Sequence, residues 1–173
     1  MKSSHFKAIV SIGVFLISTG AINNLAFAAN TQTLTINAVV GAQAKLTMTP
    51  LTINFPDADP DVTSVIDADS PVAVTVNARA GAASTLTLTA NAQSDLSDGG
   101  TNTISIANVA WIVDAGSDAG FLPGTLSNGV DVSAGTWTGG GSRSGSLKFK
   151  FVNSWNYVPA TYTANVLFTL SVT

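Results

Sequence analysis

Apolar and polar residues alternate almost without interruption over residues 161–173. The even positions are apolar or aromatic, and most odd positions are Thr, Asn or Ser. A period of two places one set on a single face of a β-strand, so the pattern predicts a long strand with one buried face. A shift of one residue would turn that face outward, so neighbouring strands must fix its register. The side chains predicted to reach the core from this final strand include Tyr162, Val166, Phe168 and Leu170.

A second alternating stretch covers residues 31–40 and ends at Gly41. It predicts another strand with one apolar face. Residues 43–48 continue in an extended pattern, and residues 51–55 form a short apolar run between two prolines, which favours a sheet edge. The apolar face of the stretch before Gly41 consists of Leu34, Ile36, Ala38 and Val40.

The middle of the chain contains many short strand patterns separated by turn residues. Residues 72–79 and 86–90 alternate on either side of a turn at Gly81, as in a hairpin or a crossover between two sheets. Further on, Gly129 and Gly135 are expected to divide the chain into short strands.

Nowhere in the chain after residue 28 does a period of 3.6 residues persist for three turns, so little helix is expected. About ten short strands with close turns predict antiparallel pairing in two packed sheets. The predicted fold is therefore all-β, an immunoglobulin-like antiparallel β-sandwich.

The first 28 residues have the pattern of a secretory signal peptide. Lys2 and Lys7 form a basic start, residues 8–17 are apolar, and residues 26–28 read Ala-Phe-Ala, a small-residue cleavage site. The mature chain is therefore expected to begin at Ala29 or one residue later, and to be secreted.

Charge is sparse in the part of the sequence after residue 28. Five basic residues stand against ten aspartates, with no glutamate. An acidic balance argues against nucleic acid and anionic membrane as partners. There is no cysteine, so the core alone must hold the fold. Hydroxyl and amide side chains must supply solubility, which suits a protein that packs against copies of itself.

Few residues of the mature chain could carry catalysis. The single histidine, His5, lies in the predicted signal peptide, and Cys and Glu are absent. An enzyme would have to rely on aspartates alone, and these lie mostly in turns, where Asp is favoured for local hydrogen bonds. We therefore expect no enzymatic activity, no cofactor and no small-molecule substrate.

Two other kinds of binding site, for calcium and for a glycan, have partial support in the sequence. Asp57, Asp59 and Asp61 resemble the start of a calcium loop, but Ala68 stands where a bidentate Glu would be needed. The stretch 57–69 is expected to be an exposed loop with one short strand at residues 62–66, and its binding of calcium is left open. Aromatic side chains can form a stacking platform for a glycan. The candidates for that platform are Trp111, Trp137 and Trp155, of which Trp111 is expected to be buried.

The exported chain, its N-terminal alternating strand, its Thr- and Ala-rich domain and the closing Pro159-x-x-Tyr162 before the final strand together resemble a chaperone-usher pilin. The chain is similar to the spore coat protein U-like and archaic pilins and to the cysteine-free pilins of colonization-factor type. The resemblance implies a donor strand at residues 29–41 and a sandwich domain at residues 42–173 that lacks one strand.

The resemblance further implies a fibre of identical subunits at the cell surface, reached through the periplasm with a chaperone and an outer-membrane usher as partners. Such a fibre would serve adhesion or biofilm formation. The donor residues would be Leu34, Ile36, Ala38 and Val40. The alternative is a monomeric secreted or surface domain, with or without glycan binding, in which residues 31–40 pair within their own chain. The alternating pattern alone leaves both open.

Overall fold

The computed structural model describes residues 32–173, and the predicted signal peptide lies outside the described residues. The chain divides after Ala38, and Val39–Thr173 forms one compact unit. Within the described part, no helix has the length and apolarity needed to cross a bilayer.

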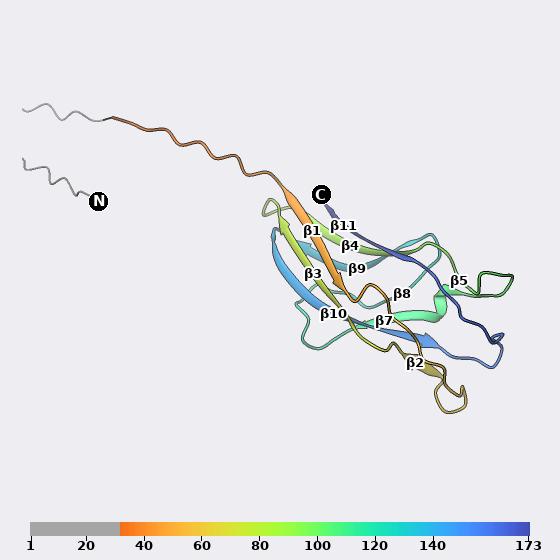
Figure 1. Ribbon diagram of the computed structural model, residues 1–173. Coiled ribbons are helices and arrows are strands. Elements are labelled where there is room, and N and C mark those ends of the chain that lie inside the picture. The colour runs from red at the N-terminus through yellow and green to blue at the C-terminus, as the bar shows by residue number, and fades with distance from the viewer. Residues whose placement is uncertain (1–31) are drawn as a thin grey trace, which may run out of the picture. The chain divides into compact units, whose positions relative to one another are not determined.

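Antiparallel ladders join the strands into two main sheets (Figure 1). The larger sheet has six strands in the order β1-β3-β10-β7-β8, with β2 beside β10. The smaller sheet has the order β11-β4-β9, and a hairpin of β5 and β6 stands apart. The bounds are β1 Gln43–Thr49, β2 Val65–Asp67, β3 Val72–Arg79, β4 Thr85–Ala92, β5 Leu96–Ser97, β6 Thr103–Ile104, β7 Val109–Val113, β8 Gly124–Thr125, β9 Asp131–Thr138, β10 Gly141–Val152 and β11 Val166–Val172.

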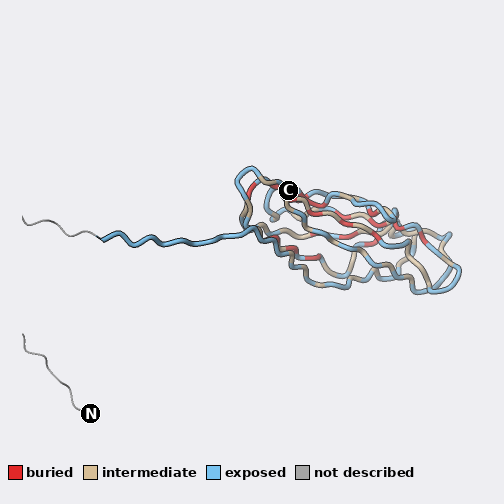
Figure 2. Tube along the Cα trace, turned by 90° about the horizontal axis from the view of Figure 1, so that it is seen from above, coloured by how far each residue is buried: buried red, intermediate tan, exposed pale blue. Residues whose placement is uncertain are grey.

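The apolar rows of the two sheets face each other and form the core, as the buried positions in Figure 2 show. On β3 and β4 alternate residues are almost fully buried, because each strand has a neighbour on both sides. These buried rows include Val72, Val74 and Val76 on β3, and Leu86, Leu88, Ala90 and Ala92 on β4. The predicted all-β sandwich is confirmed.

Two tryptophans are part of this core. Trp111 is 1% exposed and donates its indole N–H to the Leu122 carbonyl oxygen at 2.8 Å. Trp137 is 7% exposed and donates to the Ala119 carbonyl oxygen, also at 2.8 Å. The expected burial of Trp111 is thus confirmed, and both polar indole groups are satisfied inside the sandwich.

The expectation that Gly135 interrupts a strand was wrong. Strand β9 runs without a break through this position. A Cβ atom at Gly135 would lie 2.3 Å from the ring of Trp137, so the glycine makes room for that indole rather than a turn. Sequence spacing alone cannot distinguish these two uses of glycine.

Other boundaries differ from the sequence expectations. Residues 51–55 form no strand, and the short strand expected at residues 62–66 is β2, at Val65–Asp67. The final ladder with β4 begins at Val166; before it, Thr163 makes an isolated bridge to Ser97. The helical content of the described residues is a single 3₁₀ turn, Ile106–Asn108.

Candidate binding groove

Two strand edges are left open on the same side of the sandwich. β1 pairs only with β3, and β11 pairs only with β4, among the described strands. Thr173 exchanges both backbone hydrogen bonds with Thr85, and Asn165 accepts one from Gln93. In an antiparallel ladder the bonded residues alternate. The backbone groups that point to the open edge of β11 are therefore those of Val166, Phe168, Leu170 and Val172.

The side chains of the same four residues form the core-facing apolar row of β11, and each remains only partly buried. The apolar row of the neighbouring β4 is at most 1% exposed. The difference arises because β4 has a strand on both sides and β11 has one. Strand β11 thus presents both unpaired backbone groups and uncovered apolar surface along one line.

A groove of about 1570 Å³ opens beside the first half of this line, at Val166 and Phe168. It is larger than the roughly 300–1,000 Å³ typical of small-molecule pockets, and its walls are largely apolar. Its apolar lining comes from Leu46 and Met48 on β1, Leu51, Ile53 and Phe55 in the following loop, Ile66, Val72, Ile106, Val109, Phe149 and Phe151 in the floor, and Val166 and Phe168 on β11. This shape and chemistry suit an extended apolar segment of polypeptide.

One wall of the groove is held by a polar clip. The backbone N–H and the side-chain amide of Asn54 donate to the two carboxylate oxygens of Asp69, at 3.1 and 2.8 Å. The Asp69 N–H in turn donates to the Asn54 carbonyl oxygen at 2.8 Å. The side-chain hydrogen bond from Asn54 is the main reason that the pKa of Asp69 lies below its ordinary value. The clip fixes the loop between β1 and β2 against the sheet.

Aromatic rings line the end of the groove beyond β10. The rings of Phe55 and Tyr157 each lie 5.6 Å from that of Phe151. Partial burial raises the pKa of Tyr157, whose hydroxyl donates to the Val152 carbonyl oxygen at 3.1 Å. At the rim, the indole N–H of Trp155 donates to Asp61 at 3.1 Å, and Trp155 remains 67% exposed.

The structure places three of the four predicted final-strand residues, Tyr162, Val166 and Phe168, in the lining of this groove, and Leu170 outside it. Val166, Phe168 and Leu170 face the core from β11, half-covered. Tyr162 precedes β11; it lines the groove and donates its hydroxyl to the Val158 carbonyl oxygen at 2.8 Å.

The predicted donor residues are solvent-exposed. Residues 32–42 form no strand, and the side chains of Leu34 and Ile36 are each 82% exposed. Val40 is 67% exposed, and Ala38 is exposed as well. Within the described residues, this alternating apolar row is therefore not buried in the core of its own chain.

The alternative sites receive less structural support. A platform of three tryptophans is not formed, because Trp111 and Trp137 are buried and only Trp155 is exposed. Within residues 32–173, no three acidic side chains are grouped so that they could hold a metal ion. In the loop that resembled a calcium site, Asp59 accepts a hydrogen bond from the Asp61 N–H, and Asp61 accepts from Trp155.

Sequence reasoning missed the groove residues of the loop after β1. The apolar run at residues 51–55 predicts a sheet edge, whereas in the structure it forms one wall of the groove. The flanking prolines were the signal: Leu51, Ile53 and Phe55 alternate with Thr52 and Asn54 as in a strand, but prolines at both ends prevent regular pairing.

Searches with protein-family models, among curated proteins and among solved structures found no match to this chain.

Proposed function

We propose that this protein is a structural subunit of an extracellular fibre, in which the N-terminal segment of one copy fills the groove of the next. The groove between β1 and β11 carries this proposal, because a half-covered apolar row and an open strand edge lie together along it. Addition of a strand to such an edge satisfies both at once.

The occupant is a segment of the same sequence, residues 30–40. It alternates in the period that a groove beside a strand requires, it contains no charged residue, and its apolar side chains are exposed. Burial of Leu34, Ile36 and Val40 would contribute about 5 to 9 kcal/mol, at about 1.5 to 3 kcal/mol for each side chain, as an upper bound. Main-chain hydrogen bonds would add about 1 kcal/mol each.

Successive subunits would join head to tail. Because the donating segment and the accepting groove are different surfaces, each copy can donate once and accept once, which yields an open fibre rather than a closed dimer. The signal-peptide pattern supports assembly outside the cytoplasm, with a periplasmic chaperone that protects the groove and an outer-membrane usher that exports the subunit. Adhesion or biofilm formation would be the role of the fibre.

A matched pair of substitutions in the full chain tests this function. Ile36→Asp places a charge in the apolar row, whereas Asn37→Asp places the same charge on the opposite face of the same segment. We expect fibres, seen by electron microscopy and sedimentation, from the wild type and Asn37→Asp but not from Ile36→Asp. Equal assembly of both variants would exclude the donor role of this face.

The competing function is that of a monomeric surface domain. It predicts a single monomer peak for the purified secreted chain at every concentration, with or without the predicted partners. Under that reading a synthetic peptide of residues 30–40 would neither bind the chain nor stabilise it. The exposed Trp155 would then be the residue to test for glycan binding.

A further inference from the structure

The charged residues of the domain are segregated along its strands. We call one extremity the linker end: β1 begins there at Gln43, opposite Arg79 of β3, and Thr173 after β11 lies there beside Thr85. The opposite extremity, where β1 and β4 finish and β11 begins, is the distal end. Figure 1 shows the two ends on opposite sides of the domain.

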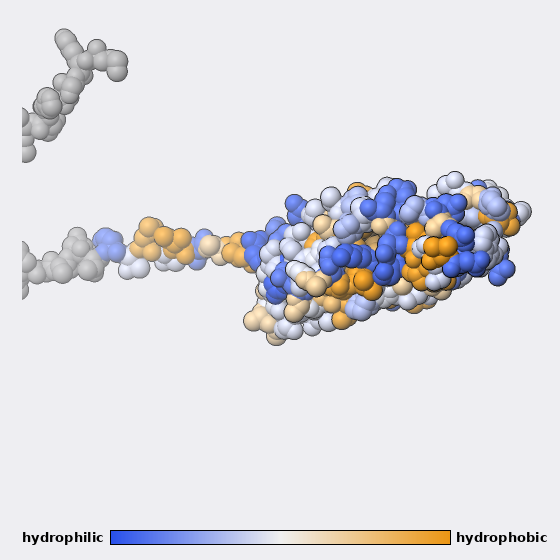
Figure 3. Space-filling view, turned by 90° about the horizontal axis from the view of Figure 1, so that it is seen from below, coloured by the Kyte–Doolittle hydropathy of each residue, from blue (hydrophilic) through white to orange (hydrophobic). Residues whose placement is uncertain are grey.

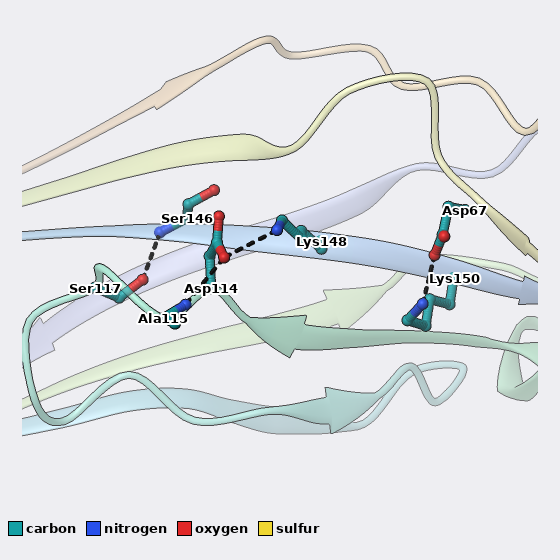
Figure 4. Close-up of polar contacts among 7 residues, drawn as sticks. All are labelled: Asp67, Asp114, Ala115, Ser117, Ser146, Lys148 and Lys150. Atoms are coloured by element: carbon teal, nitrogen blue, oxygen red, sulfur yellow. Dashed lines mark hydrogen bonds and ion pairs between the residues drawn. The ribbon is translucent and has the colours of Figure 1, made fainter.

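Eight of the ten aspartates lie at the distal end. The loop from β1 to β2 holds three of them, β2 and the residue pair after it hold two, the turn region after β4 holds two, and one opens β9. The single cation there, Lys150, is paired with Asp67, as Figure 4 shows. The eight distal aspartates are Asp57, Asp59, Asp61, Asp67, Asp69, Asp95, Asp98 and Asp131.

The linker end has the opposite charge. Lys45, Arg79 and Arg143 lie on the first residues of β1, the last of β3 and the first of β10. None of them forms an ion pair with another described residue, whereas Lys148, half-way along β10, is paired with Asp114 at 2.9 Å (Figure 4). Asp118, in the loop after β7, accepts a hydrogen bond from the Ser144 N–H of β10.

Hydrogen bonds of the linker-end arginines go to backbone carbonyls near the point where the N-terminal segment joins the domain. The Arg79 Nε donates to the Gly41 carbonyl oxygen at 2.7 Å. Arg143 donates to the carbonyl oxygens of Ser142 and Gly140. Lys45 and Arg79 line the same shallow depression. These contacts leave the positive charges uncompensated.

The distal end also exposes large apolar side chains. Figure 3 shows apolar surface among polar surface towards the end of the domain at the right of the view. A surface with apolar residues inside a charged surround has the composition of a protein interface. The exposed residues in question are Leu51, Val62, Trp155 and Val158.

The groove by itself permits two directions of filling. If the donor segment ran into the groove so that its Val40 lay at the acceptor's linker end, two linker ends would meet, and Lys45 and Arg79 would face their own copies. In the other direction the donor's linker end meets the acceptor's distal end, where the aspartates lie. Like charges facing each other are costly, and complementary ones steer association.

We propose that successive copies form a second contact outside the groove, between the cationic linker end of one subunit and the acidic, partly apolar distal end of the next, and that this contact sets the direction in which the groove is filled. The inference rests on the proposed function, since it presupposes head-to-tail copies. The partner is a second copy of this chain. The charged contact would set the orientation and raise the rate of association, while the filled groove would supply most of the affinity.

Charge reversal in the full mature chain tests the contact. Within residues 32–173, the side chains of Lys45 and Asp57 form no hydrogen bond or ion pair that a substitution would break, so we choose Lys45→Glu, Asp57→Lys and the double variant. The control is Lys148→Glu, which makes the same change of charge in the middle of β10; the ion pair with Asp114 that it removes is solvent-exposed and so contributes little to stability. The measurement is the initial rate of fibre growth as a function of ionic strength.

At low salt we expect each single variant to grow about tenfold more slowly than the wild type, and the double variant to recover, because reversal of both partners restores attraction. The growth rate of the wild type should fall as salt rises, and that of the single variants should not. Lys148→Glu should behave like the wild type. Equal rates for Lys45→Glu and Lys148→Glu, or no recovery in the double variant, would overturn the inference.

A capped peptide of residues 30–40 separates this result from failure of the proposed function. The peptide has no charged side chain, so it should stop growth of every variant at the same concentration. If it does so while charge reversal has no effect, donor-strand assembly stands and the charged contact is excluded. If the wild type forms no fibre and the peptide does not bind, both are excluded.

Discussion

At the scale of single residues, β11 is held in place by side chains that are only half-covered. Phe168 contacts the core from an edge strand, while Thr169 beside it is exposed. The two residues therefore offer a direct comparison of the two faces of one strand.

Phe168→Asp should lower the free energy of unfolding by about 2 to 4 kcal/mol, because apolar contact is lost and a carboxylate is brought against the core. Thr169→Asp should change it by less than about 0.5 kcal/mol, as is usual for an exposed site. Urea unfolding of the two variants measures both values. Equal losses would show that the faces of β11 are assigned wrongly.

Gly135 offers a second residue-scale test. A methyl group there meets the Trp137 ring at 2.3 Å, so Gly135→Ala should destabilise the fold by about 1 to 3 kcal/mol. Gly116→Ala is the matched control, because nothing lies within 4 Å of a Cβ atom at that site. Thermal unfolding of both variants gives the comparison; an unchanged midpoint for Gly135→Ala would contradict the packing role.

At the scale of elements, alternation predicted the strands that have one buried face. Residues 72–79, 86–90 and 166–172 lie in strands as their patterns require, because a period of two is recorded in the local sequence. The groove could not be predicted from alternation. It depends on which strand lies beside which, and Leu46, Ile53 and Phe151 are distant in sequence, so no local pattern shows that they line one surface.

The final strand illustrates both outcomes. Its apolar face was predicted from alternation, and the structure places Val166, Phe168 and Leu170 on that face. Their partial exposure was not predictable from the residues, because it results from the missing neighbour at the edge of the smaller sheet. The sequence of β11 is the same whether or not another strand lies beside it, so it does not record which edge is open.

The clip between Asn54 and Asp69 predicts a pH dependence of the groove wall. Because hydrogen bonds lower the pKa of Asp69 below 3.8, the clip stabilises the fold above that pH and is lost as the pH falls through the lowered pKa. As the pH falls below 3.8, the midpoint of unfolding of the wild type should therefore fall more steeply than that of Asp69→Asn.

The pKa values of Asp98 and Asp114 are also lowered, by hydrogen bonds to Asn102 and Lys148, so the comparison between wild type and Asp69→Asn is needed to isolate the clip. The binding of the capped peptide should weaken in parallel in the wild type. Identical pH profiles for the two proteins would show that the clip does not hold the wall.

At the scale of the whole molecule, a subunit whose groove is filled should be more stable than a subunit whose groove is open. A ligand that binds only the folded chain adds stability by mass action, about 2.7 kcal/mol at a concentration one hundred times its Kd. The capped peptide of residues 30–40 should therefore raise the unfolding temperature progressively with its concentration.

A peptide with Ile36→Asp is the control for that titration, and it should leave the unfolding temperature unchanged. Differential scanning calorimetry on the full chain measures the shift. A constant unfolding temperature up to millimolar peptide, with no heat of binding, would contradict the role of the groove as an acceptor.

The placement of the three tryptophans gives the molecule an optical signal of its own. Trp111 and Trp137 are sealed in the sandwich and should emit at short wavelength, out of reach of a dissolved quencher such as iodide. Trp155 stands in solvent at the rim of the groove, at the end where the proposed contact forms. The quenchable part of the fluorescence therefore comes from one residue, and its loss would report, in real time, that the distal end of a subunit has been covered.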